Sequence, residues 1–418
     1  MYAPRRPAAA PWLSKFTNVF HSGGHARTLG VLTHAVAAGK DVLGDMDMSE
    51  TTAPATTAIV SPIYATTPCN VQSGNAAVVP ETVIDVAAGP ALLLWQGSAW
   101  ANTVERAGGM QPAVGNSDPI DGASCFFNQT PMHLPLLRQR ALVSPLPQGE
   151  SLVGITASNQ FTNTDANDSV TAALLAFGSM SAPPQVRLAG SGMAMGGGSY
   201  TSQVFDCGGN DVVVSVAATA WAEVPNTLIS AVLYLDGDPI AYPMIFANPS
   251  GVHMPLNAMD IRLSGLAPGG HQLDLTAGSN TVVDDSDVWS LTVMEMQGIS
   301  GVTQLFENDV LPEQPGGQPI AKQVYQAGGG EQLILVSMSA WSQTPGRMLS
   351  ALVLVDNDPV GTLQTYANQA GMHLALTGGD FAPGVLPPGQ HAITVVAGPG
   401  TVTDENDRLC LAVLELFR

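Results

Sequence analysis

The stretch Asp284-Asp-Ser-Asp-Val-Trp-Ser-Leu-Thr-Val-Met-Glu-Met296 recurs near the end of the chain as Asp404-Glu-Asn-Asp-Arg-Leu-Cys-Leu-Ala-Val-Leu-Glu-Leu416. A more divergent copy begins at Asp165-Ala-Asn-Asp168. In the two closer copies an acidic loop leads into an apolar run of strand length. An internal repeat predicts architecture more strongly than any single local motif does.

Further markers keep the same register along the chain. Histidine, asparagine, tryptophan and aspartate each recur at steps of 119 to 121 residues, namely at His133, His253 and His373; Asn128, Asn248 and Asn368; Trp100, Trp221 and Trp341; Asp168, Asp287 and Asp407. So many recurring residues would not share one spacing by chance. We therefore predict three tandem copies at 80–178, 199–297 and 319–418, each long enough to hold its own core.

The segments around these copies have a different composition. Residues 179–198 are rich in Gly, Met and Ser, and residues 298–318 contain Leu311-Pro-Glu-Gln-Pro-Gly-Gly317. Both are predicted to be linkers. Residues 49–79, rich in Ser, Thr, Ala and Pro, are predicted to form an extended linker after an N-terminal arm at 1–48.

Within one copy the sequence predicts an all-β fold. In the third copy, apolar strands are expected at 332–341, 349–355 and 409–416, with a turn at 356–359. Six to eight short strands with a turn signal every 8–12 residues are typical of an antiparallel β-sandwich or jelly roll of about 100 residues. No helix of ten or more residues is needed inside a copy.

The apolar strands also predict how the copies pack. Met132, Leu134 and Leu136 alternate along one strand face, and this pattern recurs in the other copies. The continuous runs Leu92–Leu94 and Leu333–Leu335 supply a second apolar face for neighbours. We therefore expect threefold packing, as a homotrimer of three stacked tiers or as one chain folded into a pseudo-trimer.

Charge divides the chain into a basic arm and an acidic body. Only 11% of the 418 residues are charged, and the net charge is −20. The first 40 residues carry five basic groups and no acidic group, so the rest of the chain is at −25. Such a body repels phosphate, which argues against nucleic-acid binding by it. No apolar run reaches the ~18 residues that a membrane span needs.

The arm combines positive charge with aromatic side chains. Trp12, Phe16 and Phe20 are four residues apart and would share one face of a helix, so the arm is predicted to be partly helical. It is interpreted as an anchor that orders on a partner, with a solvated tail as the alternative. The residues expected to anchor it are Arg5, Arg6, Trp12, Lys15, Phe16, Phe20 and Arg27.

The acidic loops and the recurring histidines are candidate sites. Carboxylates at i and i+3 can offer oxygen ligands to Ca²⁺, although the same side chains also cap tight turns. The carboxylates in question are Asp165, Asp168, Asp284, Asp287, Asp404 and Asp407. Histidines 133, 253 and 373 could meet around a threefold axis as a metal site or pH switch, or each could bond to a neighbouring loop. No other cofactor is predicted.

The remaining candidates are structural. Trp100, Trp221 and Trp341 each end a long strand, where they could close the sandwich or stack on sugars. Four widely spaced cysteines predict buried free thiols of a protein made in a reducing cytoplasm, rather than a zinc site or disulfides. Catalytic motifs such as Gly-x-Ser-x-Gly, His-Glu-x-x-His and the P-loop are absent from the sequence.

The ends of the copies resemble the last two strands of tumour-necrosis-factor-like jelly rolls. The resemblance rests on the Leu386-Pro-Pro-Gly389 turn before His391, the Ala397-Gly398 loop and the final Val413-Leu-Glu-Leu416 strand. The chain is also similar to domains repeated in bacteriophage head fibres, decoration proteins and tail fibres. This resemblance implies a threefold assembly on a particle surface, and sharply matching residues number about 30 per copy.

The predicted function is that of a non-enzymatic virion surface protein, made in a host cytoplasm. Its arm would anchor it to a capsid, portal or tail protein, and its three domains would decorate the particle or attach it to a host. A glycan-binding adhesin or lectin-like module is the alternative, with a host surface glycan as partner. A depolymerase is a third hypothesis.

Overall fold

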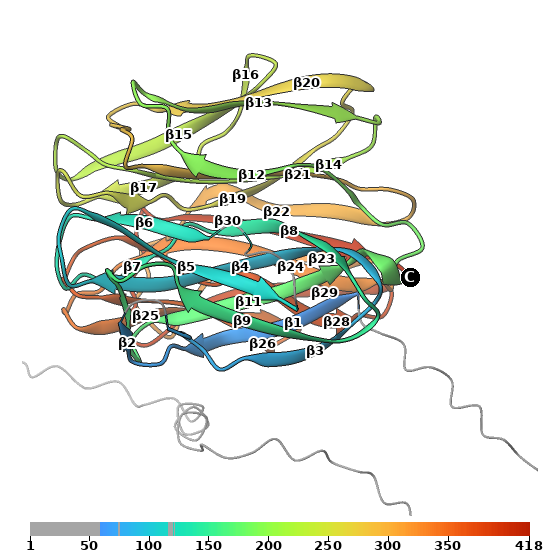
Figure 1. The fold of residues 1–418 in the computed structure, drawn as a ribbon, viewed down its shortest axis with the longest axis horizontal. Coiled ribbons are helices and arrows are strands. Elements are labelled where there is room, and N and C mark those ends of the chain that lie inside the picture. The colour runs from blue at the N-terminus through green and yellow to red at the C-terminus, as the bar shows by residue number, and fades with distance from the viewer. Residues whose placement is uncertain (1–58, 74–75, 116–119, 121) are drawn as a thin grey trace, which may run out of the picture. The chain divides into compact units, whose positions relative to one another are not determined.

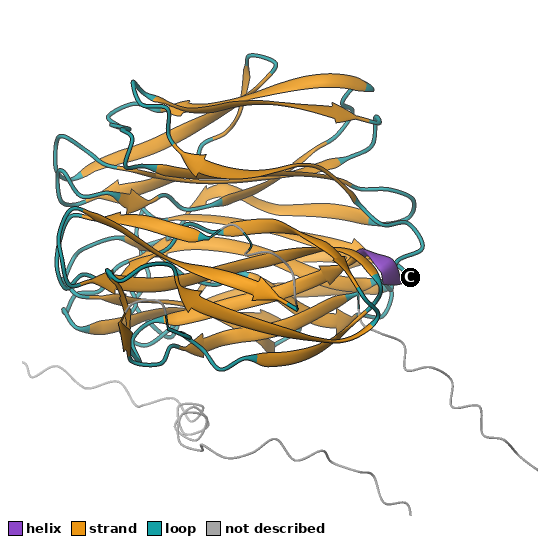
Figure 2. Cartoon of the chain, in the orientation of Figure 1, coloured by secondary structure: helices purple, strands orange, loops and turns teal. Residues whose placement is uncertain are grey.

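The computed structural model describes residues 59–73, 76–115, 120 and 122–418, which belong to one compact unit, Thr56–Arg418. The predicted arm at 1–48, with its anchoring residues and helices, lies outside the described residues. The regular secondary structure of the described part is almost entirely strand, joined by loops and turns, as Figure 2 shows. No helix in it has the length and apolar character to cross a membrane.

The first copy begins earlier than predicted, at the first described strand. Its elements are β1 (Val60–Pro68), β2 (Gln72–Ser73), β3 (Thr82–Val86), β4 (Gly89–Ala101), β5 (Arg106–Val114), β6 (Ala123–Phe127), β7 (Leu134–Pro135), β8 (Gln139–Leu146), β9 (Gly149–Ala157), β10 (Thr162–Thr164), β11 (Ser169–Ala176) and the 3₁₀ turn η2 (Phe177–Ser179).

The second copy repeats this order of strands. Its elements are β12 (Gln185–Met193), β13 (Ser199–Cys207), β14 (Val212–Ala220), β15 (Thr227–Leu235), β16 (Asp238–Ala241), β17 (Met244–Ala247), β18 (Met254–Pro255), β19 (Met259–Leu263), β20 (Gly269–Ala277) and β21 (Val288–Glu295).

The third copy repeats the order again. Its elements are β22 (Gly301–Val310), β23 (Pro319–Ala327), β24 (Glu331–Ala340), β25 (Arg347–Val355), β26 (Asp358–Ala367), β27 (Leu374–Ala375), β28 (Asp380–Val385), β29 (Gly389–Ala397) and β30 (Arg408–Leu416). The strands predicted at 332–341, 349–355 and 409–416 are confirmed as β24, β25 and β30.

Each copy is a two-sheet jelly roll, which confirms the predicted fold class. In the first copy the strand order is β1-β11-β4-β8 in one sheet and β3-β9-β5-β6 in the other. We call the first the inner sheet and the second the outer sheet; the corresponding inner sheets are β12-β21-β14-β19 and β22-β30-β24-β28. All these pairings are antiparallel, as a jelly roll requires.

The segments predicted as linkers contain the first strand of each inner sheet. Strand β12 pairs with β21 from Gln185 to Met193, and β22 pairs with β30. Likewise β1, within the segment predicted as an extended linker, pairs with β11. The Trp289 ring packs over Gly190 and Gly192 and lies 3.4–3.5 Å from where their Cβ atoms would be. Each domain therefore spans nearly the whole 120-residue repeat.

The three inner sheets face one another and close a ring. The first strand of each copy packs against a strand of the preceding copy: β12 against β8, β22 against β19, and β1 against β28. Figure 1 shows the second copy at the top of the view, with the first and third below it. The chain has the second of the two predicted threefold arrangements, a pseudo-trimer built by one chain.

Alternating residues of the inner strands belong to two different cores. Leu93 and Ile334 point into the cores between the two sheets of a copy. Their neighbours Leu92 and Leu335 belong to a separate cluster that joins all three copies, and that also contains Val213 from the second copy. Because both faces are covered, the sequence of these strands is apolar without alternation. The predicted second apolar face is confirmed.

The four cysteines are buried and unpaired, as predicted. Cys410 lies where the second and third copies meet, and its thiol donates to the Asp260 carbonyl oxygen. Burial raises the pKa of this thiol to about 12. The sulfur is therefore kept in its protonated, unreactive form.

Candidate functional site at the domain junctions

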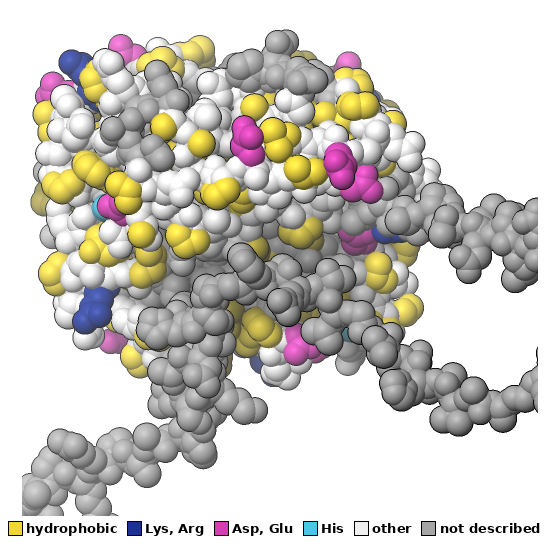
Figure 3. Space-filling view, turned by 60° about the horizontal axis from the view of Figure 1, so that its bottom comes forward, with side chains coloured by type: hydrophobic (Ala, Val, Ile, Leu, Met, Phe, Trp, Pro, Cys, Tyr) yellow, Lys and Arg dark blue, Asp and Glu magenta, His cyan; other side chains and the backbone are white. Residues whose placement is uncertain are grey.

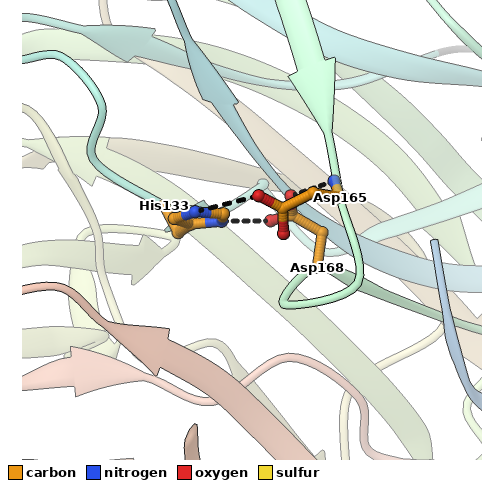
Figure 4. Close-up of side chains that lie close together, drawn as sticks. All are labelled: His133, Asp165 and Asp168. Carbon is orange, nitrogen blue, oxygen red and sulfur yellow. Dashed lines mark hydrogen bonds and ion pairs between the residues drawn. The ribbon is translucent and has the colours of Figure 1, made fainter. Parts of the chain in front are cut away.

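Each copy carries a cluster of one histidine and two aspartates. In the first copy His133 precedes β7, while Asp165 and Asp168 lie in the turn between β10 and β11. Figure 4 shows the ring of His133 facing both carboxylates. The other clusters are His253 with Asp284 and Asp287, and His373 with Asp404 and Asp407. The acidic loops and recurring histidines of the sequence thus form one kind of site.

The aspartates shape the turn that holds them. The inner aspartate, Asp168, accepts from the backbone N–H of Asp165 at 3.0 Å, and Asp165 accepts through Oδ1 from the N–H of Asn167 at 2.7 Å. The other two copies repeat both bonds at 2.8–3.0 Å. The turn-capping interpretation is therefore confirmed. The oxygens used in this way are not free to build the six to eight oxygen ligands that Ca²⁺ takes.

The inner aspartate also fixes the histidine ring. Asp168 Oδ1 lies 3.0 Å from His133 Nδ1, and the matching distances are 2.8 Å and 2.9 Å in the other copies. The inner aspartates are fully buried, and burial raises the pKa of the Asp168 and Asp287 carboxyls although the histidine bond acts in the opposite direction. The outer aspartate approaches the other ring nitrogen, Nε2, to 3.7 Å in all three copies.

The clusters lie at three separate junctions between copies, so the histidines do not meet at the axis. The backbone N–H of His253 donates to Asn128 Oδ1 of the first copy at 3.0 Å. Asn248 accepts in the same way from His373 at 2.9 Å, and Asn368 from His133 at 2.8 Å. The three hydrogen bonds run around the ring in one direction. The interpretation that each histidine bonds to a neighbouring loop is thus confirmed.

Aromatic side chains cover each histidine from two sides. Phe126, Phe246 and Tyr366 reach across the junctions, with ring centroids 5.0–5.2 Å from the histidine of the next copy. The half-buried Trp100, Trp221 and Trp341 lie 5.9–6.2 Å from the histidine of their own copy. The sequence interpretation missed the first set, although 120-residue spacing between aromatic residues was the available signal.

One junction contains an open hollow of about 480 Å³. It lies between the first and second copies, where Glu105 and Phe126 of the first copy face His253, Asp284 and Trp221 of the second. The indole N–H of Trp221 donates to Asp284 Oδ2 at 3.1 Å. At this junction the histidine–aspartate cluster therefore opens onto a hollow.

A second cluster of charged groups, which the sequence interpretation missed, lies buried where the copies meet. Arg138 contacts Asp260 at 2.9 Å and Asp380 at 2.5 Å, and Arg140 contacts the same two at 2.8 Å and 3.1 Å. All four side chains are at most 4% exposed. Burial alone would raise the pKa of Asp260, but the two guanidinium groups outweigh it and hold that pKa below its ordinary value.

We call Arg138, Arg140, Asp260 and Asp380 the axial tetrad. Arg140, Asp260 and Asp380 occupy the same position in the three copies. Each pairs with the matching residue of the central inner strand, in the pairs Leu94–Arg140, Ser215–Asp260 and Leu335–Asp380. Three identical copies would bring like charges together at this place. The tetrad is neutral because the copies differ, with two arginines from the first and one aspartate from each of the others.

Comparisons with known proteins give only distant likeness. No protein-family model matches the chain, and no curated protein matches it in sequence. Among solved structures, PNGF-II is similar over 79% of this chain and 100% of its own, with a TM-score of 0.29 and 8% identity. A triple jelly-roll protein of an archaeal virus is similar over 85% and 91%, with a TM-score of 0.19 and 9% identity. A protein of infectious bursal disease virus is similar over 87% and 78%, with a TM-score of 0.16 and 10% identity. Similarities this weak assign no function.

Proposed function

We propose that this chain is a non-enzymatic structural protein of a virus particle. Its ring of jelly rolls would project from the surface of a capsid or tail, and its basic N-terminal arm would anchor it there. The observation that carries the proposal is the closure of three jelly rolls into one ring by one chain. Such a body is a rigid unit that one gene supplies in fixed stoichiometry, which suits a repeated element of a particle surface.

The use of the recurring residues supports a structural role. The histidines and inner aspartates that mark the repeat are buried, and the partly buried asparagines bond to the histidine backbone across the contacts that hold the copies together. The tetrad Arg138, Arg140, Asp260 and Asp380 joins all three copies at the centre. The most regularly repeated polar groups therefore stabilise the ring rather than gather in one cleft.

The charge distribution supports attachment through the arm. The first 40 residues of the chain are at +5 and the remaining residues are at −25. On the described part of the face in Figure 3, charged side chains are few and scattered among hydrophobic and uncharged polar ones. Attraction between the arm and an acidic partner would be screened over a Debye length of ~8 Å, so high salt should release the chain.

The test is incorporation into particles. Particles purified from cultures of the virus that encodes the chain are probed with an antibody against its body. Wild type is compared with a full-length variant that carries Arg5→Gln, Arg6→Gln, Lys15→Gln, Trp12→Ala and Phe16→Ala. A control variant carries Lys322→Gln and Arg347→Gln on exposed positions of the body.

We expect wild type and the control to co-sediment with particles, and the arm variant to remain free with an unchanged circular dichroism spectrum. Absence of the wild-type chain from particles would overturn the virion assignment. Incorporation of the arm variant at the wild-type level would overturn the anchoring role of the arm.

A further inference from the structure

The junction between the first and second copies combines a histidine nitrogen, a carboxylate oxygen close to it and an open space. From this geometry we propose that His253 and Asp284, with Glu105 of the neighbouring copy, bind a divalent transition-metal ion such as Zn²⁺. This inference is independent of the proposed role in a virus particle. It adds a metal site that would link two of the three domains.

The histidine is oriented as metal-binding histidines are. Its Nδ1 is held at 2.8 Å by Asp287, a carboxylate that also accepts from Thr219 Oγ1 at 2.9 Å. A neutral ring that donates from Nδ1 carries its lone pair on Nε2. Histidines that bind metals almost always donate their other N–H to a carboxylate or a carbonyl, which fixes the tautomer and raises the basicity of the ligand nitrogen. Asp287 is therefore the positioning residue.

The outer aspartate presents Oδ2, which also accepts from the indole N–H of Trp221, to that lone pair. Asp284 Oδ1 accepts from the N–H of Ser286 at 2.8 Å, whereas Oδ2 lies 3.7 Å from His253 Nε2. That separation is too long for a hydrogen bond. Zinc bonds of ~2.0–2.2 Å to nitrogen and oxygen allow two ligands of one ion to lie this far apart. Imidazole with carboxylate suits first-row transition ions better than Ca²⁺.

Glu105 makes this junction different from the other two. Its backbone has a φ of 56°, and its N–H donates to the carbonyl of Phe127 at the end of β6. Asn226 and Gly346 are the equivalent residues of the second and third copies. They also have positive φ values, of 56° and 67°, and each donates its backbone N–H to a carbonyl near the end of the corresponding strand. At the equivalent positions, therefore, only the first copy supplies a carboxylate to the histidine of the next copy. Glu105 is exposed and lines the hollow, so it can complete the site together with water.

The test is isothermal titration of the chelator-treated full chain with zinc chloride. We expect one dominant site per chain, and a rise in melting temperature on zinc addition. Glu105→Asn is the sharpest variant, because asparagine occupies the equivalent position in the second copy at the same positive φ and should leave the fold intact. It should weaken zinc binding at the dominant site, and Asp284→Asn should abolish that site.

Two further variants separate metal binding from domain packing. Asp287→Asn, which replaces the carboxylate that orients the ring by an amide of the same shape, should weaken zinc binding by about 10–100-fold. Asp404→Asn is the matched control in the third copy and should leave the dominant site unchanged. Quenching of tryptophan fluorescence by Co²⁺ should be lost in Asp284→Asn and kept in Asp404→Asn, since Trp221 contacts Asp284.

The proposal is overturned if zinc produces no saturable heat with the wild-type chain. It is also overturned if Glu105→Asn and Asp284→Asn, shown to be folded by circular dichroism, bind zinc as the wild type does.

Discussion

At the scale of single residues, the axial tetrad is a polar contact in which all three copies take part. Two guanidinium groups and two carboxylates lie in a dry environment, and each arginine contacts both aspartates. Burying four charges gives little net stability by itself, since desolvation offsets much of their attraction. What the tetrad supplies is specificity, because the charges are complementary only when the first copy meets the second and the third at this place.

Removal of one aspartate should therefore be costly. In Asp380→Asn, the positive charge of Arg138 and Arg140 is no longer balanced, and we expect the free energy of unfolding to fall by about 3–5 kcal/mol. Urea denaturation followed by circular dichroism measures the change. Asp358→Asn, on an exposed turn, is the control and should change stability by less than about 0.5 kcal/mol. Equal stability of the two variants would contradict this role for the tetrad.

Glu295 gives a prediction about pH. Burial alone would raise its pKa, but N–H donors from Asn210 and Gly208 and the Arg187 guanidinium lower it to about 2. A folded-state pKa below the ordinary value of 4.5 stabilises the fold above pH 4.5, and this contribution is lost as the pH falls towards 2. The stability difference between wild type and Glu295→Gln should therefore shrink between pH 4.5 and 2 in denaturant titrations. A difference that stays constant with pH would show that the carboxylate charge is not responsible.

At the scale of elements, the first strand of each copy connects a jelly roll to the ring. Strands β1, β12 and β22 each pair with the last strand of their own copy and pack against a strand of the preceding copy. The ring is closed where Glu331 of the third copy accepts from the backbone N–H groups of Ile59 and Val60 at 3.1 Å and 2.8 Å. These segments therefore belong to the folded body.

Hydrogen exchange distinguishes a strand from a linker. Backbone amides in β12 and β22 that donate to β21 and β30 should exchange with the protection of the core strands, because their release requires the inner sheet to open. The exposed loop at 223–225 is the internal control and should exchange within the shortest labelling time. Equally fast exchange of both strands and the loop would show that these segments act as linkers.

At the scale of the whole molecule, one chain supplies all three positions of the ring. In a homotrimer of one repeated domain, Arg140 and its two equivalents would be the same residue, and their charges would repel at the axis. Here the equivalents are Asp260 and Asp380, so the threefold contacts are completed within the chain.

Sedimentation equilibrium of the full chain tests this arrangement. We expect one chain mass of 43.2 kDa, with a scattering profile of a compact body rather than of separate beads. Asp380→Asn should keep that mass while lowering stability. Three chain masses would support the homotrimer that the sequence also allowed, and an extended monomer would contradict the ring.

The sequence by itself determined the parts of this protein that follow from a pattern. The 120-residue spacing of His133, His253 and His373 established three copies, and the turn signals with short apolar runs established a β-sandwich. The continuous run Leu92–Leu94 indicated a strand buried on both faces. Turn capping by the acidic loops followed from the chemistry of aspartate at i and i+3. These features are local or strictly periodic, so they can be recognised from the amino-acid sequence alone.

The tertiary structure decided everything that depends on which copies touch. Glycine-rich β12 is a strand because it pairs with β21 along its length, with Trp289 against Gly190 and Gly192, and no local propensity predicts this pairing. Each histidine lies beside its own acidic loop and the asparagine of the preceding copy, at three junctions rather than at one axis. The axial tetrad appears only when residues 120 and 240 positions apart meet. Such contacts depend on complementary shape and charge across domains, and a repeat pattern carries no information about them.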